Sequence, residues 1–235
     1  MSRATLDVGN SSIGIAPWSD SGPGPVERFG QPEEAAARLL ALGPACCAAI
    51  AVAPRRLDAL LLHLGARAVA VRILSRPPET LGAPSLLASA GADRIANVLG
   101  VGAGPAVIVD AGTAVTVDLL ATHGAYLGGY IAPGPAAALA GLVGATECLP
   151  DVPCGSTALG PGADTAAAMQ AGVWGLVVGG VDRLVDEASR AVGSSARIVA
   201  TGGWGAAWAK ESRHVHVSWA PDLVHRGIAR WAGWA

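Results

Sequence analysis

Two stretches of the chain open in the same way, with a short apolar run that ends in Asp-x-Gly and a small turn. The first is Asp7-Val-Gly9, and the second is Asp110-Ala-Gly112. Each is followed by further short extended runs and then by helical segments. A repeated order of elements in two halves whose sequences are not otherwise repeated predicts a structural duplication. The chain should therefore fold as an α/β protein with two related halves.

Short runs rich in β-branched residues and broken by Gly, Asn, Ser and Pro predict the strands, and longer amphipathic runs predict the helices. In the first half we expect three strands over Arg3–Val8, Ile13–Trp18 and Pro25–Phe29, followed by a helix over Glu33–Leu42. A strand over Ala48–Ala53, a helix over Arg55–Leu64 and a strand over Val69–Leu74 should come next. A loop over Ser75–Ala90 leads to a helix that starts near Gly91. This order resembles that of a ribonuclease-H-like domain.

The second half repeats the pattern. We expect strands over Pro105–Val109, Ala114–Leu120 and Ala125–Ile131, helices over Pro135–Gly144 and Asp164–Ala191, a strand over Arg197–Thr201, a helix from Trp204, a strand over His214–Ser218 and a helix from Pro221. The sequence thus predicts two duplicated ribonuclease-H-like domains, residues 1–103 and residues 104–235, with a nucleotide cleft between them.

Composition excludes several classes of protein. With 51% apolar and 14% charged residues the chain is expected to fold rather than to stay disordered. The formal charge is -2 and no basic run is present, so we expect no nucleic-acid partner and no binding to an anionic membrane. The four cysteines match no zinc spacing, which favours reduced thiols in a cytoplasmic protein over a disulfide framework.

A membrane span is not expected. Residues 119–146 carry no charged side chain, but glycines and prolines interrupt them, so no apolar stretch reaches the roughly 20 residues that a span needs. The first residues also lack the apolar core of a signal peptide.

Three glycine-bearing turns carry the first chemical signal: those after Asp7 and Asp110, and Thr201-Gly202-Gly203. Glycine lets backbone N–H groups approach phosphate oxygens, and an Asp at a strand end can hold a hydrated Mg²⁺. Each turn alone is also compatible with an ordinary loop. Their combination in two duplicated halves predicts nucleotide binding. The only lysine is Lys210, so metal, turn N–H groups and hydroxyls would have to bind the phosphates.

The segment Gly91-Ala92-Asp93-Arg94 lies at a predicted helix start. Asp93 there could be a partner of the helix dipole. Alternatively, it could act as a base, since Arg94 beside it offers a fork for a carboxylate. Such a pair suits a substrate that has both a hydroxyl and an acid group.

These motifs resemble those of the actin/hexokinase/Hsp70 superfamily and, within it, the type III pantothenate kinases. That family shows Asp-x-Gly-Asn-[Thr/Ser], then Gly-Ala-Asp-Arg, then Asp-x-Gly-Thr-Ala-x-Thr. Further matching segments are Tyr126-Leu-Gly-Gly-Tyr-Ile-Ala-Pro-Gly134, Cys148-Leu-Pro150, Gly162-Ala-Asp-Thr165-Ala-Ala-Ala-Met-Gln-Ala-Gly172 and Pro221-Asp-Leu223. The resemblance runs from Asp7 to the last predicted helix.

The resemblance implies a role for each matched residue. Asp93 would be the general base, Arg94 with Gly91 and Ala92 would hold pantothenate, and Thr165 would contact it. Asp110 would bind K⁺ or NH₄⁺, and Thr113 would contact phosphate. Gly202 and Gly203 would lie at the adenosine. The triphosphate would be lined by Asp7, Val8, Gly9, Asn10, Ser11, Ser12, Ile13 and Gly14.

The resemblance also implies ATP and Mg²⁺ as cofactors and a homodimer that packs through its second domains, with Thr165 near the partner's substrate. The long run Asp164–Ala191, apolar around much of its circumference, predicts burial on more than one side, either in a dimer interface or between the two domains of one chain. Two departures stand out, because Arg76–Ala90 lacks the family's usual Tyr and Ala163 replaces a Lys. Two alternatives remain: a kinase for another small hydroxy acid or sugar, and a ligand-binding regulator without kinase activity.

Overall fold

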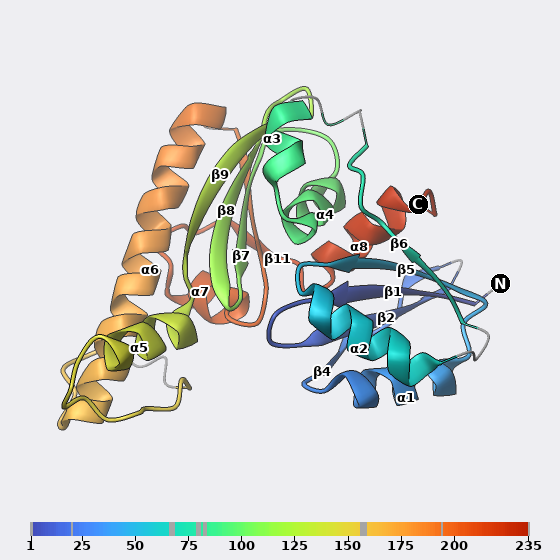
Figure 1. Cartoon of the computed structure of the whole chain (residues 1–235). Helices are drawn as coiled ribbons and strands as arrows, with labels where there is room; N and C mark the ends of the chain where they lie inside the picture. Colours follow the sequence, from blue (N-terminus) through green and yellow to red (C-terminus); the bar gives the residue numbers. More distant parts are fainter. Residues whose placement is uncertain are drawn as a thin grey trace. The chain divides into compact units, whose positions relative to one another are not determined.

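The structure is a computed structural model that describes residues 2–19, 21–65, 69–78, 81, 84–155, 159–193 and 195–234. The chain forms two compact units (Figure 1). Unit 1 comprises Met1–Ala103, Gly124–Tyr126 and Pro221–Ala235, and unit 2 comprises Gly104–His123 and Leu127–Ala220.

Unit 1 is built on a mixed sheet with the strand order β3-β2-β1-β5-β6, in which β4 also pairs with β2. Strands β1 and β2 are antiparallel, whereas β5 runs parallel to both β1 and β6. The strands are β1 (Arg3–Val8), β2 (Ile13–Ser19), β3 (Gly22–Pro23), β4 (Glu27–Phe29), β5 (Cys46–Ala51) and β6 (Ala70–Ile73). The helices are α1 (Pro32–Leu42), α2 (Pro54–Leu64), α3 (Pro84–Ser89), α4 (Ala92–Val101) and α8 (Leu223–Trp231).

The sheet of unit 1 is covered on both faces. Alternate residues of a strand point to opposite faces. Leu6 therefore packs with Leu39 of α1 and Leu60 of α2 on one side, while Ile50 packs with Ile228 of α8 on the other. Each helix of the first pair begins at a proline and ends near a glycine, as expected for helices of this kind.

Unit 2 repeats the topology. Its strands follow the order β11-β10-β7-β8-β9, with β7 and β8 antiparallel and β10 parallel to β7 and β11. The strands are β7 (Ala106–Ala111), β8 (Ala114–Leu120), β9 (Tyr126–Pro133), β10 (Arg197–Thr201) and β11 (Val217–Trp219), and the helices are α5 (Pro135–Gly144), α6 (Thr165–Val192) and α7 (Gly205–Glu211). The buried side of α6 packs through Trp174 and Val181 on Val117 of β8. The predicted duplication is confirmed.

The last helix lies in a different unit from the one expected. Residues 104–235 were predicted to form the second domain, but Pro221–Ala235 belong to unit 1. The reason is close packing of α8 on α4. A β-carbon on Gly227 would overlap the backbone of Ala96, and one on Gly100 would overlap the carbonyl oxygen of Leu223. Glycine at both positions lets the two helices approach closely.

Smaller differences concern single elements. The segment 75–90, expected as a loop, contains α3, although residues 79–80 and 82–83 lie outside the described part. The strand expected over His214–Ser218 begins only at Val217. His214 is instead outside the strand, and its backbone N–H donates to Ser212 Oγ. Among the described residues, no helix is long and apolar enough to cross a membrane.

Candidate active site

The first candidate turn joins β1 to β2. The ladder of these strands runs up to Asp7 opposite Gly14 and Val8 opposite Ile13. The Gly9 N–H then donates to the Ser12 carbonyl oxygen over 3.0 Å, which closes the turn. Asn10 and Ser11 at its tip are exposed. The structure thus places all eight predicted triphosphate residues in one hairpin, with an amide and a hydroxyl side chain open to a ligand.

The second candidate turn joins β7 to β8 in unit 2. Gly112 N–H donates to the Ala114 carbonyl oxygen over 2.9 Å, and Thr113 is exposed at the tip. Helix α5 begins beside it, because Gly134 N–H donates to the Thr113 carbonyl oxygen over 3.0 Å. A β-carbon on Gly134 would overlap the Gly112 carbonyl oxygen. The positive end of the α5 dipole therefore lies against a turn already suited to an anion.

The third turn follows β10 and meets the second. Thr201 is in register with Asp110 on the neighbouring strand β7. Gly202 adopts a left-handed φ of 85°, and Asp110 Oδ1 occupies the space where its β-carbon would lie. The Trp204 N–H donates to the Ala111 carbonyl oxygen over 2.8 Å and fixes this loop against β7. Unit 2 thus brings Asp110 and Gly202 together, while Gly203 is exposed beside them.

Thr116 is a residue of this region that sequence reasoning did not select. It lies opposite Asp110 in the β7–β8 ladder, and its Oγ1 is buried without a hydrogen-bond partner among the described residues. Directly opposite side chains lie on the same face of a sheet. A buried hydroxyl and a carboxylate on one face are oxygen ligands that suit a hard cation. The only sequence signal was the position of Thr116 within the Asp-x-Gly-Thr-Ala-x-Thr segment.

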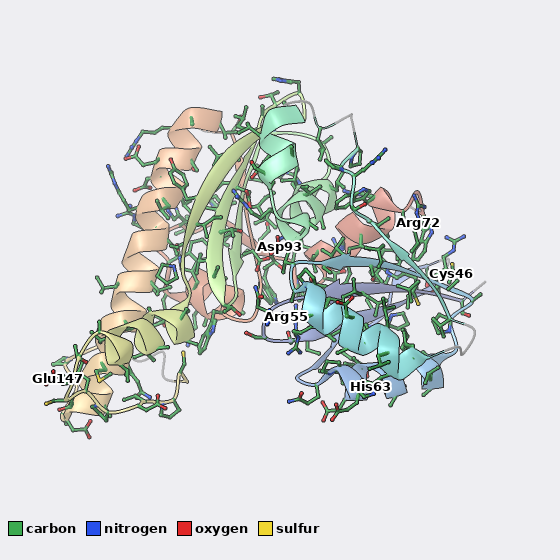
Figure 2. All side chains as sticks on the ribbon, viewed as in Figure 1. Cys46, Arg55, His63, Arg72, Asp93 and Glu147 are labelled. Carbon is green, nitrogen blue, oxygen red and sulfur yellow. The ribbon has the colours of Figure 1, made fainter. Side chains whose placement is uncertain are left out.

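The predicted base lies at the start of α4 (Figure 2). Gly91 is the N-cap residue of this helix and Asp93 is in its first turn. Asp93 Oδ1 accepts a hydrogen bond from the Arg94 backbone N–H over 2.8 Å. A β-carbon on Gly91 would lie 2.5 Å from the same oxygen, so only glycine leaves room for this arrangement. Gly91, Ala92, Asp93 and Arg94 are all partly exposed, which leaves the carboxylate accessible.

Arg94 has an aromatic neighbour from a distant part of the sequence. Its guanidinium carbon lies 5.9 Å from the centroid of the Tyr126 ring, at the start of β9 and within unit 1. Tyr126 is buried. A cation over an aromatic face is stabilised by the ring quadrupole. The segment Arg76–Ala90 lacks the family's tyrosine, and the structure supplies a different tyrosine beside the predicted carboxylate clamp.

Thr165 is the first residue of α6 and is exposed. Asp164 caps the helix, because its Oδ1 accepts from the Ala167 N–H over 2.8 Å. The structure holds Thr165 in unit 2, on a part of the surface that a substrate or a second subunit can reach.

Metal binding in this chain would rest on single carboxylates. Among the described residues there is no group of three or more His, Cys, Asp or Glu side chains that could hold a metal ion. A hydrated Mg²⁺ needs only one or two protein carboxylates together with substrate phosphates. The strand-end carboxylates Asp7 and Asp110 and the buried hydroxyl of Thr116 fit such ions.

A comparison with models of known protein families shows to which family the chain belongs. The family model described as type III pantothenate kinase matches residues 5–187. The chain belongs to the type III pantothenate kinase family. The family predicted from the motifs is confirmed, and the matched region includes the turns after Asp7 and Asp110, the Gly91–Arg94 segment and Thr165.

Curated members of the family align with a little over half of the chain. The type III pantothenate kinase of Dehalococcoides mccartyi strain CBDB1 is 40% identical over 141 residues, which cover 59% of this chain and 53% of the relative. That of Rhodopirellula baltica is 40% identical over 131 residues, covering 54% and 44%. The chain therefore spans about half the length of the curated relatives that it matches.

Solved structures support the fold. A conserved Campylobacter jejuni protein assigned to the Baf family of transcriptional activators superposes with a TM-score of 0.63 at 21% identity, covering 98% of this chain and 97% of that one. The ethanolamine utilization protein EutJ from Carboxydothermus hydrogenoformans gives 0.53 at 14% identity, covering 98% and 90%. The likeness extends over nearly the whole chain and agrees with the two duplicated ribonuclease-H-like domains described above.

Proposed function

We propose that the protein is an ATP-dependent pantothenate kinase, which phosphorylates the primary hydroxyl of pantothenate to give 4'-phosphopantothenate, the first step of coenzyme A biosynthesis. The observation that carries the proposal is the start of α4, where an accessible carboxylate and a guanidinium follow each other in the Gly-Ala-Asp-Arg motif. Membership of the type III pantothenate kinase family supports it.

Asp93 is the general base in this proposal. The hydrogen bond from the Arg94 backbone N–H orients its carboxylate at the partly exposed start of α4. The pantothenate hydroxyl oxygen forms a bond to the γ-phosphorus of ATP, and the bond from that phosphorus to the β–γ bridging oxygen breaks. ADP leaves with the bonding electrons, and Asp93 accepts the hydroxyl proton.

Arg94 is the proposed clamp for the carboxylate of pantothenate. The planar guanidinium can bind a carboxylate through two parallel hydrogen bonds. The neighbouring ring of Tyr126 restricts where the guanidinium can lie and so lowers the entropy cost of binding. Gly91 and Ala92 border the same substrate, and Thr165 is its remaining proposed contact.

The nucleotide is proposed to use the glycine turns. The hairpin of Asp7 to Gly14 and the hydroxyl of Thr113 contact phosphate oxygens, and the turn of Gly202 with the exposed Gly203 leaves room for adenosine. When bound, Mg²⁺ supplies positive charge that neutralises the phosphates. Asp110 would hold K⁺ or NH₄⁺, and the buried hydroxyl of Thr116 on the same sheet face supports this assignment.

The proposed assembly is a homodimer in the cytoplasm. Support for the dimer comes from α6, whose exposed face carries Leu176 with 77% of its surface accessible. Charged residues are absent from this helix before Asp182. No nucleic acid or membrane partner is proposed.

A coupled assay of ADP release tests the function. We expect release that depends on pantothenate in the presence of ATP, Mg²⁺ and K⁺. Other small hydroxy acids and sugars, tested in parallel, should give at least a hundredfold lower kcat/KM. Preference for one of them would change the substrate assignment, and ATP binding without any turnover would favour a regulatory role.

A further inference from the structure

A buried histidine joins α8 to the first hairpin of unit 1. His225 is fully buried, and its Nδ1 lies 2.9 Å from the Oγ1 of Thr5 on β1. The same hydroxyl oxygen accepts a hydrogen bond from the indole Nε1–H of Trp18 on β2, also over 2.9 Å. One threonine thus connects the helix with both strands of the hairpin that carries the proposed phosphate-binding turn.

The other edge of the imidazole lies against Gly14. A β-carbon at this position would be 3.0 Å from Nε2 and 3.4 Å from Cε1 of His225. Gly14 is the residue opposite Asp7 in the β1–β2 ladder. The ring therefore fills the side-chain space beside Asp7, on the face of the sheet that Thr5 and Asp7 share.

Core packing alone does not explain a histidine here. Nε2 is buried and has no hydrogen-bond partner among the described residues. Leaving such a group unsatisfied is destabilising. Burial, with a smaller contribution from the charge of Arg28, lowers the pKa of His225 to about 3, so the ring is neutral near pH 7. An apolar side chain would fill the same volume without this cost.

We propose that His225 is a positioning residue for the first phosphate-binding turn. Held by Thr5, its imidazole sets the distance between Gly14 and α8. Because Gly14 pairs with Asp7 in the β1–β2 ladder, this distance also determines where Asp7 and the turn closed by Gly9 lie. The inference rests on the proposed kinase function, and it adds to that function a residue more than 200 positions away from the turn.

A double-mutant cycle between Gly14→Ala and His225→Asn tests the contact. The asparagine keeps an amide nitrogen near the position of Nδ1 but removes the part of the ring beside Gly14. We expect Gly14→Ala to raise the KM for ATP at least tenfold, because the methyl group meets the imidazole. In the double variant the methyl group enters the vacated space, so the KM for ATP should fall at least threefold relative to Gly14→Ala. The KM for pantothenate should change less than twofold throughout.

Three further variants keep the test decisive if the Gly14 variant is unstable. Thr5→Val removes the hydrogen bond to Nδ1 and should raise the KM for ATP several-fold, whereas Thr5→Ser keeps the hydroxyl and should not. Ile228→Val is the matched structural control, since it loosens the packing of α8 without touching Gly14. It should lower Tm and leave the KM for ATP unchanged.

Hydrogen exchange of the peptide that spans residues 6–15 gives a readout independent of turnover. Faster exchange there in His225→Asn and Thr5→Val, but not in Ile228→Val, supports the inference. Additive effects in the cycle, or a change in KM for ATP in Ile228→Val as large as that in His225→Asn, overturn it. A wild-type protein that binds ATP without phosphorylating pantothenate would refute the proposed function. In that case the double-mutant cycle still tests the role of His225, with Kd for ATP measured in place of KM.

Discussion

The carboxylate of Asp110, near the end of β7, packs directly against the α-carbon of Gly202, which follows β10. The β-carbon that any other residue would place at position 202 would lie only 2.4 Å from Asp110 Oδ1 and 2.6 Å from the Ala111 carbonyl oxygen. A left-handed φ of 85° adds to the demand for glycine. The position of this carboxylate therefore depends on the absence of a side chain on a neighbouring strand.

Gly202→Ala should weaken nucleotide binding by displacing Asp110. We expect Kd for ATP to rise at least tenfold and Tm to fall by several degrees, since a strained backbone alone costs about 1–3 kcal/mol. Gly141→Ala on α5 is the matched control, because its β-carbon would meet nothing within 4 Å and its φ is not left-handed. Calorimetric titration measures Kd for ATP in both variants. An equal rise of Kd in the two variants would show that the contact with Asp110 is unimportant.

Activity should require K⁺ or NH₄⁺ and should be at least tenfold lower in Na⁺ alone. The physical reason is a site of Asp110 and Thr116 oxygens, whose size and ligand number suit one cation better than another. Asp110→Asn should abolish the difference between the salts. Steady-state rates in K⁺, NH₄⁺ and Na⁺ buffers of equal ionic strength measure this dependence. Full activity in a Na⁺-only buffer would mean that K⁺ or NH₄⁺ has no role in the mechanism.

Asp93→Asn should lower kcat by about 10² or more, the magnitude expected for loss of a general base. Kd for ATP should stay within twofold of the wild-type value, since the turns that bind phosphate are unchanged. Asp58→Asn, on the exposed side of α2, is a control that should have no effect on either constant. An equally large loss of ATP binding in Asp93→Asn would mean that this carboxylate holds a metal ion instead.

Light scattering at micromolar concentration should give the mass of a dimer, and Leu176→Arg should give that of a monomer. Leu176 is 77% exposed on α6, with Gly172, Gly179 and Gly180 exposed on the same side of the helix. A charge placed there would lie in the proposed interface without a partner. Leu62→Arg provides the control, since Leu62 is similarly exposed (79%) but lies on α2 in unit 1. A monomeric wild-type protein with full activity would exclude the dimer.

The stability of the fold should fall in acid partly through His225. Its pKa is about 3 in the folded protein and about 6.5 when unfolded. Below pH 6.5 the unfolded chain binds a proton that the folded chain does not, so the unfolding free energy decreases as the pH falls from 6.5 towards 3. The slope for one such proton is at most about 1.36 kcal/mol per pH unit.

The charged group that acts on His225 is the guanidinium of Arg28 on β4, and Gly14, which lies against the imidazole, is opposite Asp7 of β1 in the ladder. Urea unfolding at pH 7, 6, 5 and 4 should show a shallower pH dependence for His225→Asn than for the wild type. Parallel curves for the two proteins would mean that the imidazole is protonated in the folded state as well.

Local chemistry made much of the site predictable. The hairpin from Asp7 to Gly14, the turn at Gly112 and the helix start at Gly91 each depend on residues within a few positions of one another. Glycine and Asp have strong conformational preferences at turns and helix starts. The order of the strands followed from the alternation of apolar runs and turns, and both halves have the predicted topology.

Contacts between distant segments were not predictable in the same way. Tyr126 reaches Arg94, and His225 reaches Thr5 and Gly14, only because the fold brings remote segments together. The placement of α8 in unit 1 likewise depends on its packing against α4, for which a single sequence carries no direct signal. The sequence shows that residues 100 and 227 are glycines, but it does not show that they lie at the same contact between α4 and α8.

The return of Pro221–Ala235 to unit 1 has a consequence for synthesis on the ribosome. The face of the first sheet that carries Ala48 and Ile50 is covered in part by Val224 and Ile228 of α8. Roughly 120 residues must be translated after α4 before α8, which takes roughly 6 to 24 s at about 5–20 residues per second. During that interval the apolar face of the nascent first unit is incompletely covered and open to chaperones, so the unit that begins to emerge first is the one that is completed last.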